Sequence, residues 1–405
     1  MKSNKILLYI TPFVFLISVA NAAEAVPTEA VLNSVFGVNV HMSNCCNGNY
    51  GNTKMVIEEL QYIGARKARD WASSDKIINE WLAINKATGI TFHVSIPQTS
   101  PEKQRKALLR IERWLGEHPK LIDVIEGSNE ADTGYPKSQG ASLEDATALQ
   151  YEVYKVGKKY NIPVAQLSVG GGWKPPFYEG NYKNFGKPPA DFGNAHVYLN
   201  PNGTPYSTLK RLVALGEYSV DGKPVDITEF GIYASSKQDD SVTSAYMHQA
   251  PFDAYLMGLP YFFIYALHDD ISGVVGFYDD NGKKRAFADY WHHTTRLLSD
   301  PNGKTLEPKN IDIKFENQKS TGSGELGIKN LVMYKSDGST WIVTYDEEKS
   351  GAENGFQTIR FEKEHKTIRV YDGRNGVLVK TLNDESHLNI ILAPNHVFLV
   401  EASDN

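Results

Sequence analysis

Eight short runs of apolar and β-branched residues, recurring at similar intervals, constrain the fold of this chain more than any other feature. The runs begin about 32 residues apart on average, which is the length of one strand, one helix and two short connections. Amphipathic segments fill the gaps, and several of them open with Ser or Thr followed by acidic residues, as helices prefer at their N-termini. The strand-like runs comprise residues 35–40, 65–71, 90–97, 121–127, 164–170, 192–199, 225–231 and 261–268.

Eight repeated βα units over roughly 270 residues predict an α/β fold of the (β/α)8, or TIM, barrel class. The alternative, an open doubly wound sheet, usually carries a glycine-rich phosphate-binding turn after its first strand, and no such turn follows residues 35–40. The fifth unit is irregular, because residues 171–189 are rich in Gly, Pro and aromatic residues and show no helical period. We expect this segment to form a long loop at the mouth of the barrel.

The C-terminal part of the chain has a different pattern. From Thr305 onward, short alternating runs are separated by turns such as Ser336-Asp337-Gly338 and the stretch DGRNG at residues 372–376, which are typical of β-hairpins. We interpret residues 305–405 as an antiparallel β-sandwich domain that follows a catalytic-type barrel of residues 23–304. A chain of 405 residues with 41% apolar residues can bury a core in each of two such domains.

The N-terminus has the composition of a secretory signal peptide. Lys2 and Lys5 precede a 14-residue apolar run from Ile6 to Val19, and small residues follow it. A membrane anchor needs roughly 20 apolar residues, so we assign residues 1–22 to a cleaved signal peptide and expect a secreted or periplasmic protein. No later segment of the sequence is long and apolar enough to span a bilayer.

Charge and cysteine usage limit the partners. Removing the signal peptide takes away two lysines and changes the formal net charge from −6 to −8, so we expect no nucleic-acid partner. The only cysteines, Cys45 and Cys46, are neighbours and cannot connect distant parts of the fold; they form either a strained vicinal disulfide or two free thiols. No second ligand pair at zinc-like spacing accompanies them, so we predict no metal site. We also expect no cofactor and a monomeric protein.

Two glutamates stand at strand ends, where barrels place their catalytic groups. Glu130 follows the fourth predicted strand directly after Asn129, and Glu229 lies in the seventh, in the stretch VDITEFG. They are about three βα units apart, which places their carboxylates on opposite sides of the barrel mouth, converging on its axis. Two facing carboxylates suit glycoside hydrolysis, in which one protonates the leaving oxygen and the other attacks the anomeric carbon or activates water. Two unrelated, solvated glutamates are the simpler alternative.

With these residues the chain resembles the clan A retaining glycosidases, the barrel clan that contains glucanases, β-xylosidases and exopolysaccharide hydrolases, the last two groups being the nearest. The likeness covers residues 35–300, and the pairing of Asn-Glu on strand four with Glu on strand seven is its most specific element. The resemblance implies that Glu130 is the acid/base, Glu229 the nucleophile and Asn129 a ligand of the sugar 2-hydroxyl. In the implied double displacement Glu130 starts protonated, with a raised pKa, and Glu229 starts ionised.

Four further residues match positions of the clan. Arg69, at the end of the second strand, corresponds to the arginine that pairs with the nucleophile and keeps it ionised, although a surface salt bridge is the alternative. His196 and Tyr198 point the same way by the period of two and match the pair beside the two glutamates; a packed core histidine is the alternative for His196. His41 ends the first strand, where such residues line the sugar subsite.

The end of the eighth strand departs from the clan, which often has a tryptophan there that stacks on the sugar. This chain offers Tyr265, His268 and Asp269 instead, and we take His268 and Asp269 as substrate-binding candidates. Aromatic faces pack against the apolar side of pyranose rings, so other aromatic residues in mouth loops are candidates for the stacking platform. These are Trp71, Trp173 and Tyr135.

Glu126 and a run of glycines are interpreted as structural features near the predicted site. Glu126, four residues before Glu130, is interpreted as a buried carboxylate beneath the site. The glycine run at residues 170–172 is interpreted as tight packing or a sugar-facing loop. Aspartates such as Asp132 and Asp269 lack calcium-loop spacing, which argues against a catalytic metal.

The predicted function is hydrolysis of an oligo- or polysaccharide, with an exopolysaccharide favoured by the resemblance alone. A barrel that binds carbohydrate without cleaving it, and a component of surface assembly, are alternatives from other classes. The sugar, its linkage and endo or exo action depend on the conformation of loops, which the sequence does not predict. The C-terminal domain is either a carbohydrate-binding module or a packing partner of the barrel.

Overall fold

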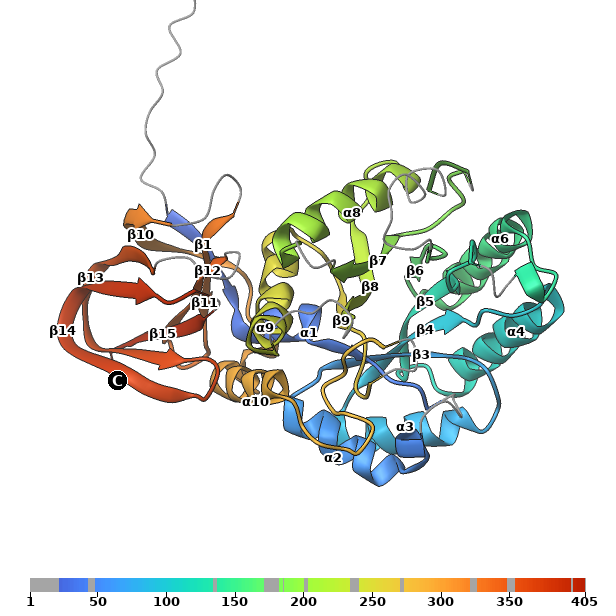
Figure 1. Ribbon diagram of the computed structural model, residues 1–405, viewed down its shortest axis with the longest axis horizontal. Coiled ribbons are helices and arrows are strands. Elements are labelled where there is room, and N and C mark those ends of the chain that lie inside the picture. Colours follow the sequence, from blue (N-terminus) through green and yellow to red (C-terminus); the bar gives the residue numbers. More distant parts are fainter. Residues whose placement is uncertain are drawn as a thin grey trace, which may run out of the picture.

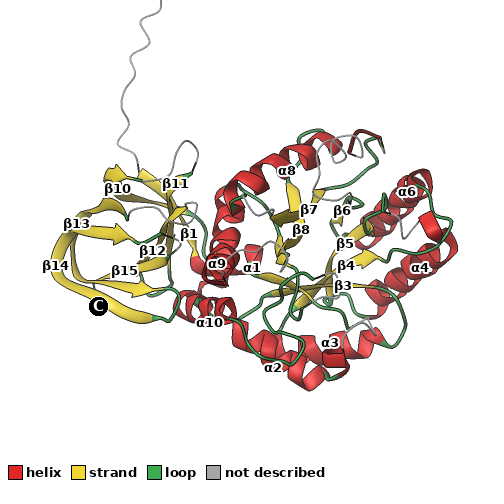
Figure 2. Ribbon diagram, viewed as in Figure 1, coloured by secondary structure: helices red, strands yellow, loops and turns green. Residues whose placement is uncertain are grey.

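Strands and helices alternate from Thr28 to Leu298, whereas the described residues after Lys309 form strands alone (Figures 1 and 2). The result is an α/β barrel beside an all-β domain. This computed structural model describes residues 22–42, 48–133, 137–170, 182–184, 186–199, 203–233, 240–269, 273–320, 326–347, 354–394 and 396–404. The predicted signal peptide lies outside the described residues.

The barrel is a sheet of eight parallel strands in the order β6-β5-β4-β3-β2-β9-β8-β7. A single parallel bridge between Ala165 and Phe192 brings the two ends of this sheet together, so the ring is nearly closed. Each of the eight predicted runs overlaps one of these strands, which confirms the barrel prediction. The strands are β2 (Gly37–Asn39), β3 (Lys67–Trp71), β4 (Thr91–Ile96), β5 (Ile122–Ser128), β6 (Val164–Ala165), β7 (Gly193–Leu199), β8 (Val225–Ile232) and β9 (Phe262–Ile264).

Helices surround the barrel and end where the sequence signals place their caps (Figure 2). Ser142 and Asp145 form a reciprocal capping box at the start of α6, Pro101 begins α4, and Gly64 and Gly89 end α2 and α3 in the left-handed conformation. The helices are α1 (Thr28–Val35), α2 (Thr53–Ile63), α3 (Ile77–Thr88), α4 (Pro101–Glu117), α6 (Leu143–Tyr160), α8 (Pro205–Ser219), α9 (Asp240–Leu256) and α10 (Ala286–Leu298).

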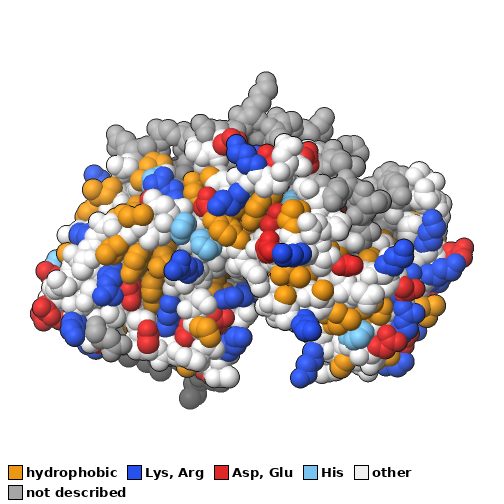
Figure 3. All heavy atoms as spheres, turned by 90° about the horizontal axis from the view of Figure 1, so that it is seen from below, with side chains coloured by type: hydrophobic (Ala, Val, Ile, Leu, Met, Phe, Trp, Pro, Cys, Tyr) orange, Lys and Arg blue, Asp and Glu red, His pale blue; other side chains and the backbone are white. Residues whose placement is uncertain are grey.

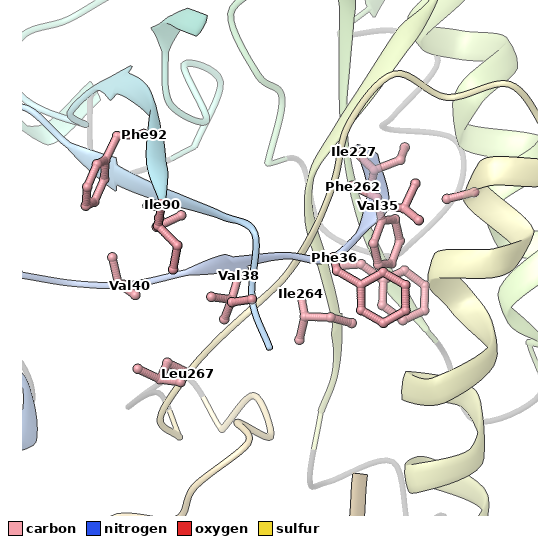
Figure 4. Close-up of a cluster of buried hydrophobic side chains, with 14 of the residues drawn as sticks. Val35, Phe36, Val38, Val40, Ile90, Phe92, Ile227, Phe262, Ile264 and Leu267 are labelled. Carbon is pink, nitrogen blue, oxygen red and sulfur yellow. The ribbon is translucent and has the colours of Figure 1, made fainter. Parts of the chain in front are cut away.

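The apolar core lies between the barrel strands and these helices (Figure 4). Phe36, at the end of α1, packs against Phe252 of α9 and Trp291 of α10, with ring centroids 5.7 and 4.6 Å apart. Val38 on β2 and Ile264 on β9 are fully buried nearby. This packing fixes β2 and β9 against the helices, and their carboxyl ends therefore have defined positions at the barrel mouth.

The all-β domain is a ring of strands and does not confirm the predicted β-sandwich. Its strands are joined in the order β10-β1-β11-β12-β15-β13-β14, and an additional pairing of β10 with β13 closes six of them into a ring, with β14 attached outside. The sandwich prediction failed because strand patterns do not tell which edges pair. The strands are β1 (Ala22–Pro27), β10 (Lys309–Lys319), β11 (Gly327–Tyr334), β12 (Thr340–Glu347), β13 (Gly355–Asp372), β14 (Val377–Leu392) and β15 (Val397–Ser403).

Strand β1 belongs to this ring and not to the barrel. It pairs with β10 in an antiparallel and with β11 in a parallel arrangement, although the sequence analysis assigned residues 23–27 to the barrel. The largest apolar cluster continues from the barrel helices into one side of β11, β12 and β15. In addition, the Tyr345 hydroxyl donates to Asp253 of α9 at 2.5 Å. The two parts of the chain therefore share a continuous core.

None of the helices in the described part of the chain is long and apolar enough to cross a membrane. On the face shown in Figure 3, basic and acidic side chains are interspersed without a continuous basic patch.

Candidate active site

A buried arginine holds the centre of the barrel mouth together. Arg69 on β3 is 1% exposed, and each of its five N–H groups has an acceptor. Its Nε and Nη2 donate to the two oxygens of Glu126 at 2.7 and 2.9 Å, and Nη1 donates to Glu229 Oε1 and to Asn39 Oδ1, both at 2.8 Å. The second Nη2 hydrogen bond goes to Asn129 Oδ1 at 2.6 Å. The guanidinium thus fixes four side chains from three strands or their ends, those of β2, β5 and β8, in one plane.

An irregularity in β8 turns Glu229 toward this arginine. Ile227 faces the apolar core, and side chains alternate along a strand, so a regular strand would send Thr228 inward and Glu229 outward. The register of β7 against β8 shifts at this point, and His196 pairs with Glu229, which leaves Thr228 as the extra residue. Thr228 still bonds Asn194 inside the barrel at 2.6 Å. The bulge therefore brings two successive side chains inside.

Glu130 occupies a strained backbone position just beyond β5. Its φ of +39° lies in the left-handed region, which costs a non-glycine residue free energy and is often found at functional sites. Its N–H donates to Ser168 Oγ at 2.9 Å, and its Oε2 accepts from Gln98 Nε2 at 2.7 Å. A Cβ on Gly170 would come within 2.3 Å of the Glu130 carboxyl carbon. The first glycine of the predicted run is thus needed for tight packing.

His196 lies between the two carboxylates. Its Nδ1 is 3.1 Å from Glu130 Oε1 and 3.2 Å from Glu229 Oε2. One oxygen of each glutamate and this nitrogen all lie within 4.8 Å of one another. The two glutamates, predicted from distant parts of the sequence, therefore face each other across a single imidazole.

The Tyr198 hydroxyl completes the surroundings of Glu229. Tyr198 follows His196 by two residues on β7 and points the same way, as the alternation predicted; its hydroxyl donates to Glu229 Oε2 at 2.5 Å. The side chain of Glu229 is 4% exposed, whereas that of Glu130 is 22% exposed. Water or a departing group thus has easier access to Glu130.

The charges of the cluster shift its pKa values. Burial raises the pKa of Glu229, and Glu130 adds to this, although His196 and Arg69 act in the opposite direction. Burial also raises the pKa of Glu130, but the hydrogen bonds from His196 and Gln98 outweigh it, and the pKa of Glu130 falls below its usual value. Burial lowers the pKa of His196, whereas the two carboxylates raise it above the usual value overall.

These directions differ from the sequence-based expectation of a raised pKa on Glu130 and an ionised Glu229. The physical reason is the position of His196 midway between two carboxylates. The carboxylates make the imidazole easier to protonate, and the protonated imidazole in turn favours the ionised form of the carboxylate that it hydrogen-bonds. The sequence placed His196 beside the glutamates but could not place its ring between them.

Aromatic rings line one side of the site. The His41 ring contacts Tyr265, Trp71 and Tyr50 edge to face, with centroids 5.2, 5.5 and 5.7 Å apart. Tyr265 in turn lies 6.2 Å from the Tyr198 ring. His41, Trp71 and Tyr265 therefore form a continuous aromatic wall that reaches the residue bonded to Glu229.

Other sequence candidates lie elsewhere. His268 is fully buried and its Nε2 is 2.9 Å from Glu59 on α2, and Asp269 pairs with Arg285 at 2.5 Å and accepts from the Gly276 N–H. These contacts hold the loop after β9 in place, so we do not include His268 and Asp269 in the site. Trp173 and Tyr135 lie outside the described residues.

The sequence did not identify every residue that contacts the central groups; besides Ser168, it missed Gln98 and Asn39. Gln98 bonds Glu130, and Asn39 bonds Arg69. Gln98 stands two residues after β4, so a search of every strand end would have found it. Asn39 shares a strand face with His41 by the period of two, but nothing in its neighbourhood distinguishes it from a core amide.

No protein family model matches the sequence, and no curated protein is similar to it in sequence. Similar solved structures exist nonetheless. A family 39 glycoside hydrolase from the gut symbiont Bacteroides cellulosilyticus WH2 is 15% identical, with 93% of this chain and 82% of that chain covered and a TM-score of 0.61. The chain therefore has the fold of this family 39 glycoside hydrolase.

Two further structures extend this likeness. A glucosidase from Croceicoccus marinus is 12% identical, covers 94% of this chain and 99% of its own, and has a TM-score of 0.63. A family 39 β-xylosidase from Caulobacter crescentus is 12% identical, with coverages of 95% and 98% and a TM-score of 0.57. The likeness to these structures thus extends over the all-β domain as well as the barrel, whereas the sequence resemblance covered the barrel only.

Proposed function

We propose that this protein is a retaining β-glycoside hydrolase. The observation that carries the proposal is the pair of carboxylates from Glu130 and Glu229, which approach to within 4.8 Å through His196. Retaining glycosidases place their two carboxyl groups about 5–5.5 Å apart, whereas inverting enzymes need about 6.5–9.5 Å to admit a water. The short separation supports direct attack by one carboxylate.

Glu229 is the proposed nucleophile, because it is the more buried of the two and is oriented by Arg69 and Tyr198. Glu130, which is more exposed, is the proposed acid/base, since the leaving group and the incoming water both have to reach it. His196 Nδ1 lies 3.1 Å from Glu130 Oε1, so a protonated His196 can pass the required proton to Glu130 when substrate binds. Asn129 Oδ1 accepts from Arg69, which leaves Nδ2 to donate to the sugar 2-hydroxyl.

The proposed substrate is an oligo- or polysaccharide in which His41, Trp71 and Tyr265 contact the bound sugar. Two of the similar structures are named a glucosidase and a β-xylosidase, which favours a neutral pyranose. In the described part of the site, Arg69 already has five acceptors, and no carboxylate of a charged sugar is needed to balance it. We further propose export by the N-terminal signal, no metal or organic cofactor in the reaction, and a packing role for the all-β domain.

The roles are tested by azide rescue of two alanine variants on an aryl β-glycoside. Glu229→Ala with azide should form the α-glycosyl azide, because azide enters the space of the nucleophile. Glu130→Ala with azide should form the β-glycosyl azide, through an intact glycosyl-enzyme. Exchanged stereochemistry would reverse the two roles.

A panel of glycans identifies the substrate and tests the enzyme class. Release of reducing ends by the wild type, lost in Glu229→Ala, is expected for at least one β-linked glycan. Binding of a glycan without release of reducing ends from any member of the panel would instead support a carbohydrate-binding barrel.

A further inference from the structure

Two of the distances between the atoms that face each other in this site match those between the ligand atoms of a zinc site. Tetrahedral Zn²⁺ with bonds of about 2.0–2.1 Å separates its ligand atoms by roughly 3.3 Å. His196 Nδ1 lies 3.1 Å from Glu130 Oε1 and 3.2 Å from Glu229 Oε2. In the described part of the chain this is the one group of three or more His, Cys, Asp or Glu side chains with metal-binding geometry. We propose that Zn²⁺ binds these three atoms and, on the proposed function, blocks hydrolysis.

The surrounding charges favour a cation at this position. Two buried carboxylates, those of Glu126 and Glu229, and the more exposed carboxylate of Glu130 lie around a single guanidinium, that of Arg69. Glu126 takes two of the Arg69 hydrogen bonds, so the charge of Arg69 is already shared. Even when His196 carries a proton, the three carboxylates face only two positive charges, those of Arg69 and His196. A divalent ion that displaces the His196 proton reduces this imbalance.

The three ligands are held in place by other contacts. Gln98 bonds the second oxygen of Glu130, and Arg69 bonds the second oxygen of Glu229. The other two oxygens, Glu130 Oε1 and Glu229 Oε2, face the same ring nitrogen, and Glu229 Oε2 also accepts from the Tyr198 hydroxyl. Supporting contacts of this kind orient metal ligands and increase affinity.

The mixture of one imidazole and two carboxylates selects the ion. Ca²⁺ takes six to eight oxygen ligands and Mg²⁺ an octahedron of oxygens, and neither fits a three-atom group that includes nitrogen. Zn²⁺ accepts nitrogen and carboxylate ligands in a tetrahedron, with the fourth position open to solvent. A Zn²⁺ ion there occupies both proposed catalytic carboxylates, so a sugar cannot reach them.

Isothermal titration calorimetry with ZnCl2 tests the site directly. The background carries Cys45→Ser and Cys46→Ser, because thiolates bind Zn²⁺. One ion should bind per chain, and His196→Gln or Glu130→Gln should weaken binding by more than the roughly 10–100-fold that loss of a supporting residue costs. The control is His365→Gln, which removes a surface histidine 2.8 Å from Asp404, a pair without a third ligand.

The outcomes separate the two parts of the proposal. The site is disproved if Zn²⁺ does not bind, or if the His196 and Glu130 variants bind it as the parent does. With an active substrate, Zn²⁺ should raise the apparent KM without changing kcat, and EDTA should reverse this; an unchanged KM disproves the blockade. A protein that binds Zn²⁺ through His196 but cleaves no glycan would contradict the proposed function and leave the metal site intact.

Discussion

Replacing Arg69 with lysine keeps a positive charge in the barrel but removes hydrogen-bond donors. Arg69 uses all five N–H groups, whereas lysine has three, so at least two of the five contacts to Glu126, Asn39, Glu229 and Asn129 are lost. Each buried polar group left without a partner costs about 1–3 kcal/mol. The two losses together lower the free energy of unfolding by about 2–6 kcal/mol.

The same change should slow catalysis. A lysine ammonium cannot hold Glu126 and Glu229 in one plane, so Glu229 and Asn129 lose their fixed positions beneath the sugar. Misplacement of reacting groups by about 1 Å costs on the order of 100-fold in rate, and we expect a fall of that size in kcat/KM.

Unfolding in guanidinium chloride, followed by circular dichroism, measures the free energy of unfolding. Hydrolysis of an aryl glycoside that the wild type cleaves gives kcat/KM. Arg66→Lys is the matched control, since Arg66 is 26% exposed and its Nη2 contacts Glu29 at 3.2 Å; its effect should stay within about 1 kcal/mol. If Arg69→Lys changed neither quantity more than Arg66→Lys does, the central role given to the guanidinium would be wrong.

Two further variants test the buried charges. Burial raises the pKa of Asp226 well above its usual value, and neither of its oxygens has a partner among the described residues. The folded state therefore retains a proton that the unfolded chain loses above about pH 3.9, and stability falls by up to about 1.4 kcal/mol per pH unit above that. Asp226→Asn cannot titrate, so its stability relative to the wild type should rise from pH 4 to pH 7; a constant difference in thermal unfolding would contradict this. Tyr198→Phe removes a hydrogen bond that lowers the pKa of Glu229, so the acidic limb of kcat/KM against pH should move to higher pH. If the acidic limb does not move, Tyr198 does not influence the pKa of Glu229.

The barrel strands and the pair of His196 and Tyr198 could be predicted from local sequence. Spacing identified all eight barrel strands, and the alternation on β7 placed His196 and Tyr198 on one face. These features were predictable because they depend on residues close together in the chain.

The remaining features depend on contacts between distant segments. The bulge at Thr228 turns Glu229 inward, and no residue type near it marks the extra position. Likewise β1 pairs with β10 and β11, which lie beyond the whole barrel in sequence, and β10 pairs with β13 to close the ring. The lowered pKa of Glu130 has the same origin, because it depends on a histidine contributed by another strand.

Covalent trapping tests the central claim most directly. A 2-deoxy-2-fluoro glycoside with a good leaving group slows the second step of double displacement, so the glycosyl-enzyme accumulates and can be digested and sequenced by mass spectrometry. The account predicts one added glycosyl group on the peptide that contains Glu229. A label on Glu130, or steady hydrolysis of substrate with inverted configuration and no label, would contradict it.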